Sequence, residues 1–104
     1  MCFGKTPICG AEGGPLEFID ENNINTGILI NGSYSVCEHG DPAFPELFTG
    51  NEDWFCPDEI QMKKAMRFYY ENRGKIDRTQ GLQHAEKFSY TNVGNMIKEA
   101  LNDC

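Results

Sequence analysis

Two adjacent glycines, Gly13 and Gly14, are the residues of this sequence whose type and position best suit binding chemistry. They follow a short apolar run and precede Pro15, which is favoured in the first turn of a helix because its missing N–H is not needed there. Glycines let the backbone approach an anion closely, and the free N–H groups at a helix start then hold a phosphate or diphosphate. A ligand-free turn between strand and helix explains the same pair equally well.

A strand–helix–strand unit would position this turn. Apolar runs predict strands over about 6–10 and 27–31, and Pro15 opens a short helix that is expected to end at Asn22-Asn23. Within that helix, Leu16 and Ile19 are expected to face inward. In open α/β sheets, ligands bind beyond the carboxyl ends of strands, which is where the glycines would lie.

Three helices are predicted in the second half of the chain, over about 57–73, 78–87 and 90–102. Pro57 is expected at the first helical position of the first helix, while Asp77 and Ser89 are expected to cap the other two. The predicted fold class is therefore α/β: a partial Rossmann-like βαβ unit followed by three C-terminal helices. Two apolar stripes are expected to form core, namely Met62, Ala65, Met66 and Tyr69, and Val93, Met96, Ile97, Ala100 and Leu101.

Residues 1–104 are predicted to form a single domain, with 32–55 as an aromatic-rich loop insertion that packs its own side chains. The formal net charge of −7 argues against a nucleic-acid partner and an anionic membrane surface. No apolar run approaches the length of a transmembrane segment, and the N-terminus has no signal-peptide pattern. These features predict a cytoplasmic protein.

Five cysteines at irregular spacings predict reduced thiols rather than a disulfide framework. A zinc site using Cys37, His39 and Cys56 is an alternative, but zinc sites normally have two close ligand pairs and the second is absent here. No cofactor is predicted. His39 and His84 have no nucleophile nearby in sequence and are most simply surface residues.

Several motifs follow one another in the order found in a known enzyme family. They are MCFGKTPI at 1–8, EGGPLEFI at 12–19, NTGILI at 25–30, WFCPD at 54–58 and KFSY at 87–90. In this order and spacing, the chain resembles the C-terminal domain of the group 1, retaining glycosyltransferases with GT-B architecture. The resemblance covers most of the chain apart from 34–52.

The resemblance implies a Rossmann-like domain that binds a nucleotide-sugar donor. The substrate-binding residues it implies are Gly13, Gly14, Pro15, Leu16 and Glu17, with the glycine turn near the donor diphosphate and Glu17 at the acidic position after it. In this family the donor phosphate is thought to act in the transfer step, so no general base is sought in this chain.

The family's catalytic glutamates and the basic residues that hold the diphosphate would lie upstream of Met1, which is expected to be an internal methionine. The chain is therefore expected to be a fragment that cannot transfer sugar alone. A homo-oligomer that covers an exposed sheet edge or helix faces is also expected. The alternative is a free-standing α/β interaction module without catalytic activity, using the aromatic segment 44–55 as its contact surface.

Overall fold

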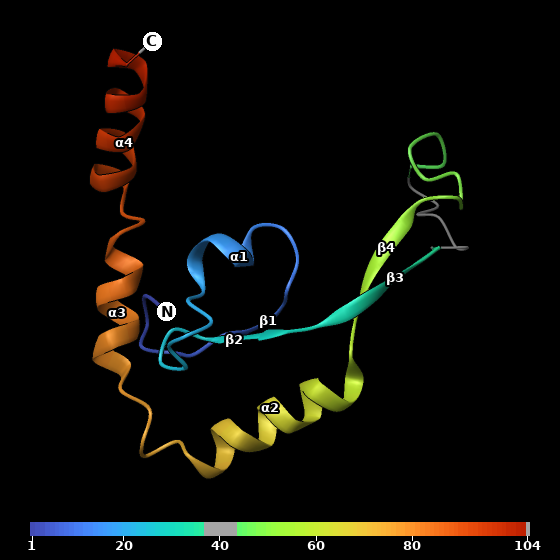
Figure 1. Cartoon of the computed structure of the whole chain (residues 1–104), viewed down its shortest axis with the longest axis horizontal. Helices are drawn as coiled ribbons and strands as arrows, with labels where there is room; N and C mark the ends of the chain where they lie inside the picture. Colours follow the sequence, from blue (N-terminus) through green and yellow to red (C-terminus); the bar gives the residue numbers. More distant parts are fainter. Residues whose placement is uncertain (37–43, 104) are drawn as a thin grey trace.

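The chain is a mixed α/β structure, described over residues 1–36 and 44–103 of a computed structural model (Figure 1). Strand β1 (Ile8–Gly10) pairs in parallel with β2 (Ile28–Ile30), and helix α1 (Pro15–Phe18) lies between them in sequence. The predicted strand–helix–strand order is therefore present, with shorter strands than expected.

Helix α1 is a single turn that ends at Phe18, so the prediction of an end at Asn22-Asn23 is wrong. Ile19 already has extended backbone angles, and its side chain is buried, whereas Leu16 is 53% exposed. The chain leaves the helix early because the buried Thr26 hydroxyl binds it into a turn. Its oxygen accepts a hydrogen bond from the Asp20 N–H at 3.0 Å.

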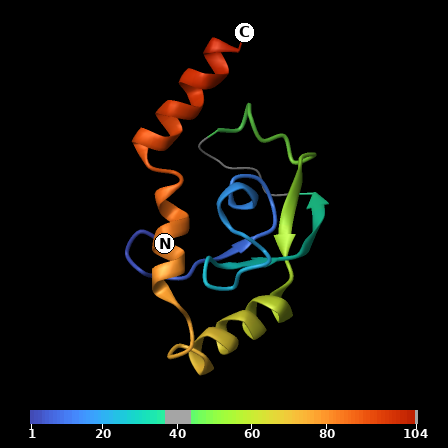
Figure 2. The same ribbon diagram turned by 60° about the vertical axis from the view of Figure 1, so that its left-hand side comes forward.

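A second sheet occupies part of the segment expected to be loop. Strand β3 (Gly32–Val36) pairs in antiparallel fashion with β4 (Asp53–Pro57), and Figure 2 shows the two as a ribbon beside the first sheet. The prediction of a loop over 32–55 is therefore wrong at both ends, where β3 and β4 lie. Cross-strand contacts account for the pairing, since Tyr34 lies opposite Phe55 with ring centroids 5.7 Å apart.

Three longer helices follow: α2 (Glu59–Glu71), α3 (Arg78–Glu86) and α4 (Tyr90–Asn102). Asp77 and Ser89 cap α3 and α4 as predicted, each accepting a backbone N–H in the first turn. Pro57 does not start α2. It is the last residue of β4, because Asp58 takes the N-cap position and its carboxylate accepts the N–H groups of Ile60 and Gln61.

The buried apolar core is small. Among the described residues, its members are Ile19, Ile30 and Ala65. The radius of gyration is 17.5 Å, against about 13 Å for a compact domain of 100 residues. Figure 1 shows α4 projecting away from both sheets. The prediction that both apolar stripes are core is therefore wrong for much of each stripe, since Met66, Met96, Ile97 and Leu101 are all more than half exposed.

Candidate functional site

The glycine turn begins where β1 ends. The Ala11 N–H donates to the Ile30 carbonyl at 2.8 Å, which continues the pairing with β2 by one residue. The chain then turns sharply at Gly13, whose φ of +64° lies in the left-handed region that favours glycine. Gly14 is the N-cap of α1 with ordinary helical angles, and the N–H of Leu16 donates to the Gly13 carbonyl at 3.1 Å.

The surface around this turn is open. A Cβ atom added at Gly13 or at Gly14 would meet no heavy atom within 4 Å. Within residues 1–36 and 44–103, neither glycine N–H donates a hydrogen bond to a protein acceptor. Gly13, Gly14 and Glu17 are exposed, and Pro15 is half-buried. The five predicted residues thus form one accessible stretch with two free backbone donors.

Helix α1 contributes little to anion binding by its dipole, because a single turn aligns only a few peptide units. Any anion at this turn would be held mainly by direct hydrogen bonds from the N–H groups of Gly13 and Gly14. Glu17 is the acidic residue in the first turn of α1. It would lie near such an anion and oppose its charge.

Glu12 and Tyr34 flank the turn and were missed at the level of sequence. The Tyr34 hydroxyl donates a hydrogen bond to the Glu12 carboxylate. This bond, together with slight desolvation and the negative charge of Glu12, raises the pKa of Tyr34. The contact ties the turn to β3, and no local sequence pattern indicates it because 22 positions separate the two residues.

His84 has a packing role rather than the exposed position predicted for it. Its Nε2 lies 2.8 Å from the Phe18 carbonyl, and its ring contacts Phe88 at a centroid distance of 5.7 Å. Because Phe18 is the last residue of α1, this hydrogen bond joins α3 to the end of the one-turn helix.

The proposed zinc ligands Cys37 and His39 lie outside the described residues. The Cys56 sulfur, which would be the third ligand, lies 3.1 Å from the Ser35 hydroxyl. In the part of the chain that the structure describes, no cluster of three or more His, Cys, Asp or Glu side chains is arranged to hold a metal.

Comparison with protein-family models, with curated proteins and with solved structures found no match for this chain. None of the helices in residues 1–36 and 44–103 has the length and apolar character needed to cross a bilayer. The family resemblance therefore rests on the sequence motifs alone.

Proposed function

We propose that this chain is part of the donor-binding domain of a cytoplasmic retaining glycosyltransferase, and that the turn at Gly13-Gly14 contacts the diphosphate of a nucleotide-sugar. The observation that supports this most is the open glycine turn at the carboxyl end of β1, with two N–H groups free to donate. Parallel pairing of β1 and β2 is the arrangement in which such turns bind phosphates.

In this proposal the chain binds and orients the donor, and it supplies no catalytic residue. The two glycine N–H groups would donate to phosphate oxygens, and the absence of side chains at Gly13 and Gly14 leaves that surface open. The carboxylates of Glu12 and Glu17 oppose a bound anion. Affinity of the chain alone is therefore expected to be weak, in the millimolar range.

Calorimetric titration of the purified chain with UDP-glucose and with GDP-mannose tests the proposal. Both are expected to bind, because the turn contacts the diphosphate they share, whereas uridine and glucose are expected not to bind. Gly14→Ala is expected to weaken binding at least tenfold, since its Cβ would occupy the space of a phosphate oxygen. Equal affinity of the variant and the wild type would contradict the proposed site, and detectable sugar transfer by the chain would contradict its inactivity.

Self-association is a further part of the proposal. Exposed apolar side chains on α4, including Met96, Ile97 and Leu101, leave a face that another copy would cover. β1 pairs with β2, and its second edge is another candidate surface. Sedimentation equilibrium is expected to show a species heavier than 11.7 kDa, and a monomer at all concentrations would contradict this part.

A protein-interaction module is the second candidate, and the exposed aromatic residues of the β3–β4 ribbon and of the segment that leads into β4 favour it. Tyr34, Phe44 and Trp54 are each close to half exposed or more, and Trp54 contacts Phe48 at a centroid distance of 5.6 Å. Exposed aromatic clusters are common at protein interfaces. This candidate predicts that the calorimetric titration shows no binding of either nucleotide-sugar.

A further inference from the structure

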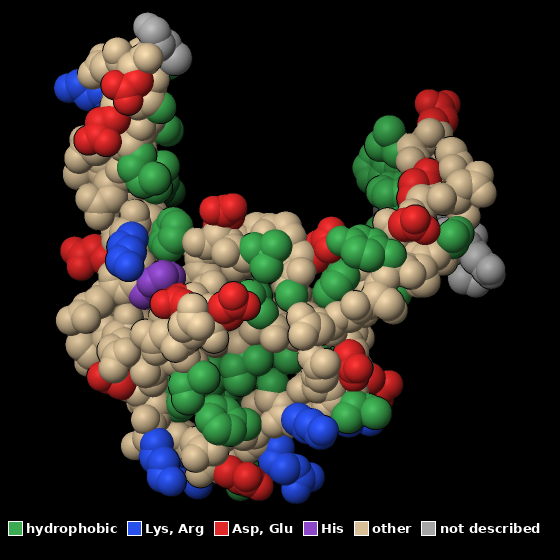
Figure 3. Space-filling model, viewed as in Figure 1, with side chains coloured by type: hydrophobic (Ala, Val, Ile, Leu, Met, Phe, Trp, Pro, Cys, Tyr) green, Lys and Arg blue, Asp and Glu red, His purple; other side chains and the backbone are tan. Residues whose placement is uncertain are grey.

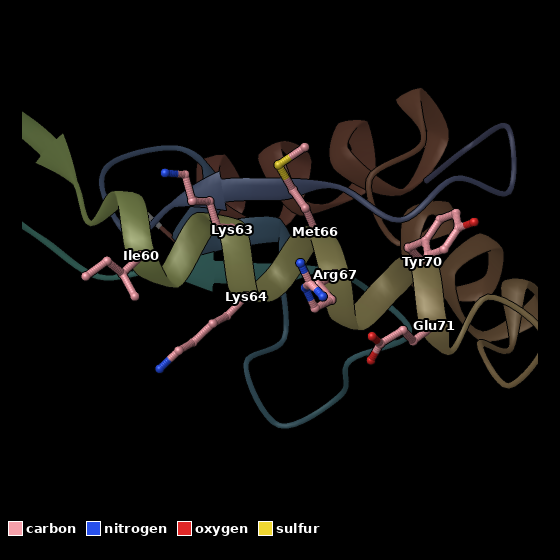
Figure 4. Close-up of a pocket in the computed structure, with 7 residues that line it drawn as sticks. All are labelled: Ile60, Lys63, Lys64, Met66, Arg67, Tyr70 and Glu71. Atoms are coloured by element: carbon pink, nitrogen blue, oxygen red, sulfur yellow. The ribbon is translucent and has the colours of Figure 1, made fainter.

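The outer face of α2 is a mixed apolar and basic surface. The opposite side of this helix carries the buried Ala65 and lies against β1 and β2. The outer side lines an open hollow of about 770 Å³, shown in Figure 4. Seven residues line this hollow and define what we call the α2 outer face, with Glu71 as the one acid among them: Ile60, Lys63, Lys64, Met66, Arg67, Tyr70 and Glu71.

Three apolar side chains of this face are strongly exposed: Ile60 at 65%, Met66 at 58% and Tyr70 at 69%. From Ile60 to Tyr70 the face extends about 15 Å along the helix, at a rise of about 1.5 Å per residue. A face of this length matches about three turns of a second helix.

The charge of the α2 outer face is opposite to that of the whole chain. Lys63, Lys64 and Arg67 are three of the nine Lys and Arg residues in a chain of net charge −7. Figure 3 shows Lys and Arg side chains interspersed with Asp and Glu side chains along the edge where α2 lies. Lys63 pairs with Glu59 at 2.6 Å, but this pair is highly exposed and of little energetic value. Among the described residues, Lys64 and Arg67 form no ion pair.

We propose that the α2 outer face binds an amphipathic helix of another protein, with acidic residues beside its apolar stripe. Apolar anchors flanked by cations are complementary to such a helix. A nucleic acid or an anionic bilayer would meet the repulsion of the whole −7 chain, whereas a short acidic helix presents only a few charges to the face. Ile60 and Met66 also give a helix an apolar surface that a phosphate backbone does not use.

This site is independent of the glycine turn and of sugar transfer. Its failure and the failure of donor binding are therefore distinguishable. Gly14→Ala is expected to leave helix binding unchanged, and substitutions on α2 are expected to leave nucleotide-sugar binding unchanged.

Fluorescence anisotropy of labelled peptides tests the proposal on the full chain. The probe is a designed 16-residue helical peptide with leucines along one stripe and glutamates on both sides of it. Two peptides serve as controls. One has the same composition with the leucine stripe scrambled, and the other keeps the stripe but has lysines in place of the glutamates. The acidic amphipathic peptide is expected to bind at least tenfold more tightly than either control, and more weakly at 300 mM than at 50 mM salt.

Matched variants distinguish an effect of the α2 outer face from an effect of the net charge of the chain. Lys64→Glu with Arg67→Glu is expected to weaken binding at least tenfold, and Ile60→Ser several-fold. The control, Lys75→Glu with Lys98→Glu, changes the net charge equally outside the face and is expected to retain binding.

Several results would overturn the proposal. They are the absence of peptide binding, equal binding of the scrambled peptide, and equal loss in both charge-reversal variants. Preferential binding of single-stranded RNA or of phosphatidylserine vesicles would also overturn it. So would self-association that is lost in the Lys64→Glu and Arg67→Glu variant when no peptide binds, because the occupant would then be a second copy of the chain.

Discussion

The Thr26 hydroxyl is the contact on which we expect the connection between α1 and β2 to depend most. Thr26 is fully buried. Its hydroxyl accepts the Asp20 N–H at 3.0 Å and donates to the Asn23 carbonyl at 2.8 Å, with the Asp20 carbonyl as a second acceptor at 3.2 Å. Thr26→Val preserves the volume and removes all three hydroxyl contacts. Both carbonyls keep a backbone donor, since the Thr26 N–H lies 3.0 Å from the Asn23 carbonyl and the Asn23 N–H lies 2.9 Å from the Asp20 carbonyl. The main cost therefore falls on the Asp20 N–H.

A part-buried N–H left without an acceptor costs about 1–3 kcal/mol of unfolding free energy. We expect Thr26→Val to lower the unfolding free energy by that amount, which is a large share of the stability of a small domain. Thr26→Ser is the control, because it keeps the hydroxyl and deletes one methyl group at a cost of about 1 kcal/mol.

Urea unfolding followed by circular dichroism measures the free energy of unfolding of all three proteins. The expected order of stability is wild type, then Thr26→Ser, then Thr26→Val. Wild-type stability in Thr26→Val would refute the reasoning, because the hydroxyl would then contribute nothing. A Thr26→Ser variant less stable than Thr26→Val would show that the methyl group matters more than the hydrogen bonds.

Three further predictions concern the turns and caps. Gly13→Ala is expected to lower the free energy of unfolding by about 1–2 kcal/mol, because the backbone φ at this position is positive. Gly14→Ala is expected to lower it by less than about 0.5 kcal/mol, because the helical angles of Gly14 suit alanine. Equal thermal midpoints for the two variants would contradict this difference. Asp77→Ala is expected to cost about 1 kcal/mol by removing the cap of α3, and an unchanged midpoint would contradict that role. Hydrogen bonds from Thr49 lower the pKa of Glu52 from 4.5 to about 2. Because this pKa is depressed, the Glu52 carboxylate contributes fully to folding stability above pH 4.5, and its contribution is lost as the pH falls toward 2. An NMR titration measures this pKa, and a midpoint near 4.5 would show that the turn does not form.

Local features of the fold were predictable from the sequence. Asp77 and Ser89 were identified as caps because their side chains act within three residues of their own position. The runs at 6–10 and 27–31 contain β1 and β2, since short apolar segments bounded by turn residues are typical of buried strands.

Features that depend on distant partners were not predictable. The pairing of β3 with β4 joins residues about 20 positions apart, and aromatic side chains within a glycine-rich segment did not indicate it. The burial of a helical stripe depends on what lies opposite. The pattern of Val93, Met96 and Ile97 predicted an amphipathic helix without showing that Met96 and Ile97 are exposed.

The candidate site was predicted only as a position in the chain. The sequence indicated the glycines and a helix start, but the Glu12–Tyr34 and His84–Phe18 contacts that hold the turn come from tertiary structure. The glycosyltransferase assignment stays a prediction from the motifs.

Mapping amide chemical shifts during titration of the ¹⁵N-labelled chain with UDP-glucose tests the central claim most directly. The proposal predicts that the largest shifts occur at Gly13, Gly14 and Leu16 and that uridine does not reproduce them. Spectra unchanged at millimolar UDP-glucose, or shifts confined to residues away from this turn, would contradict a diphosphate site at the end of β1.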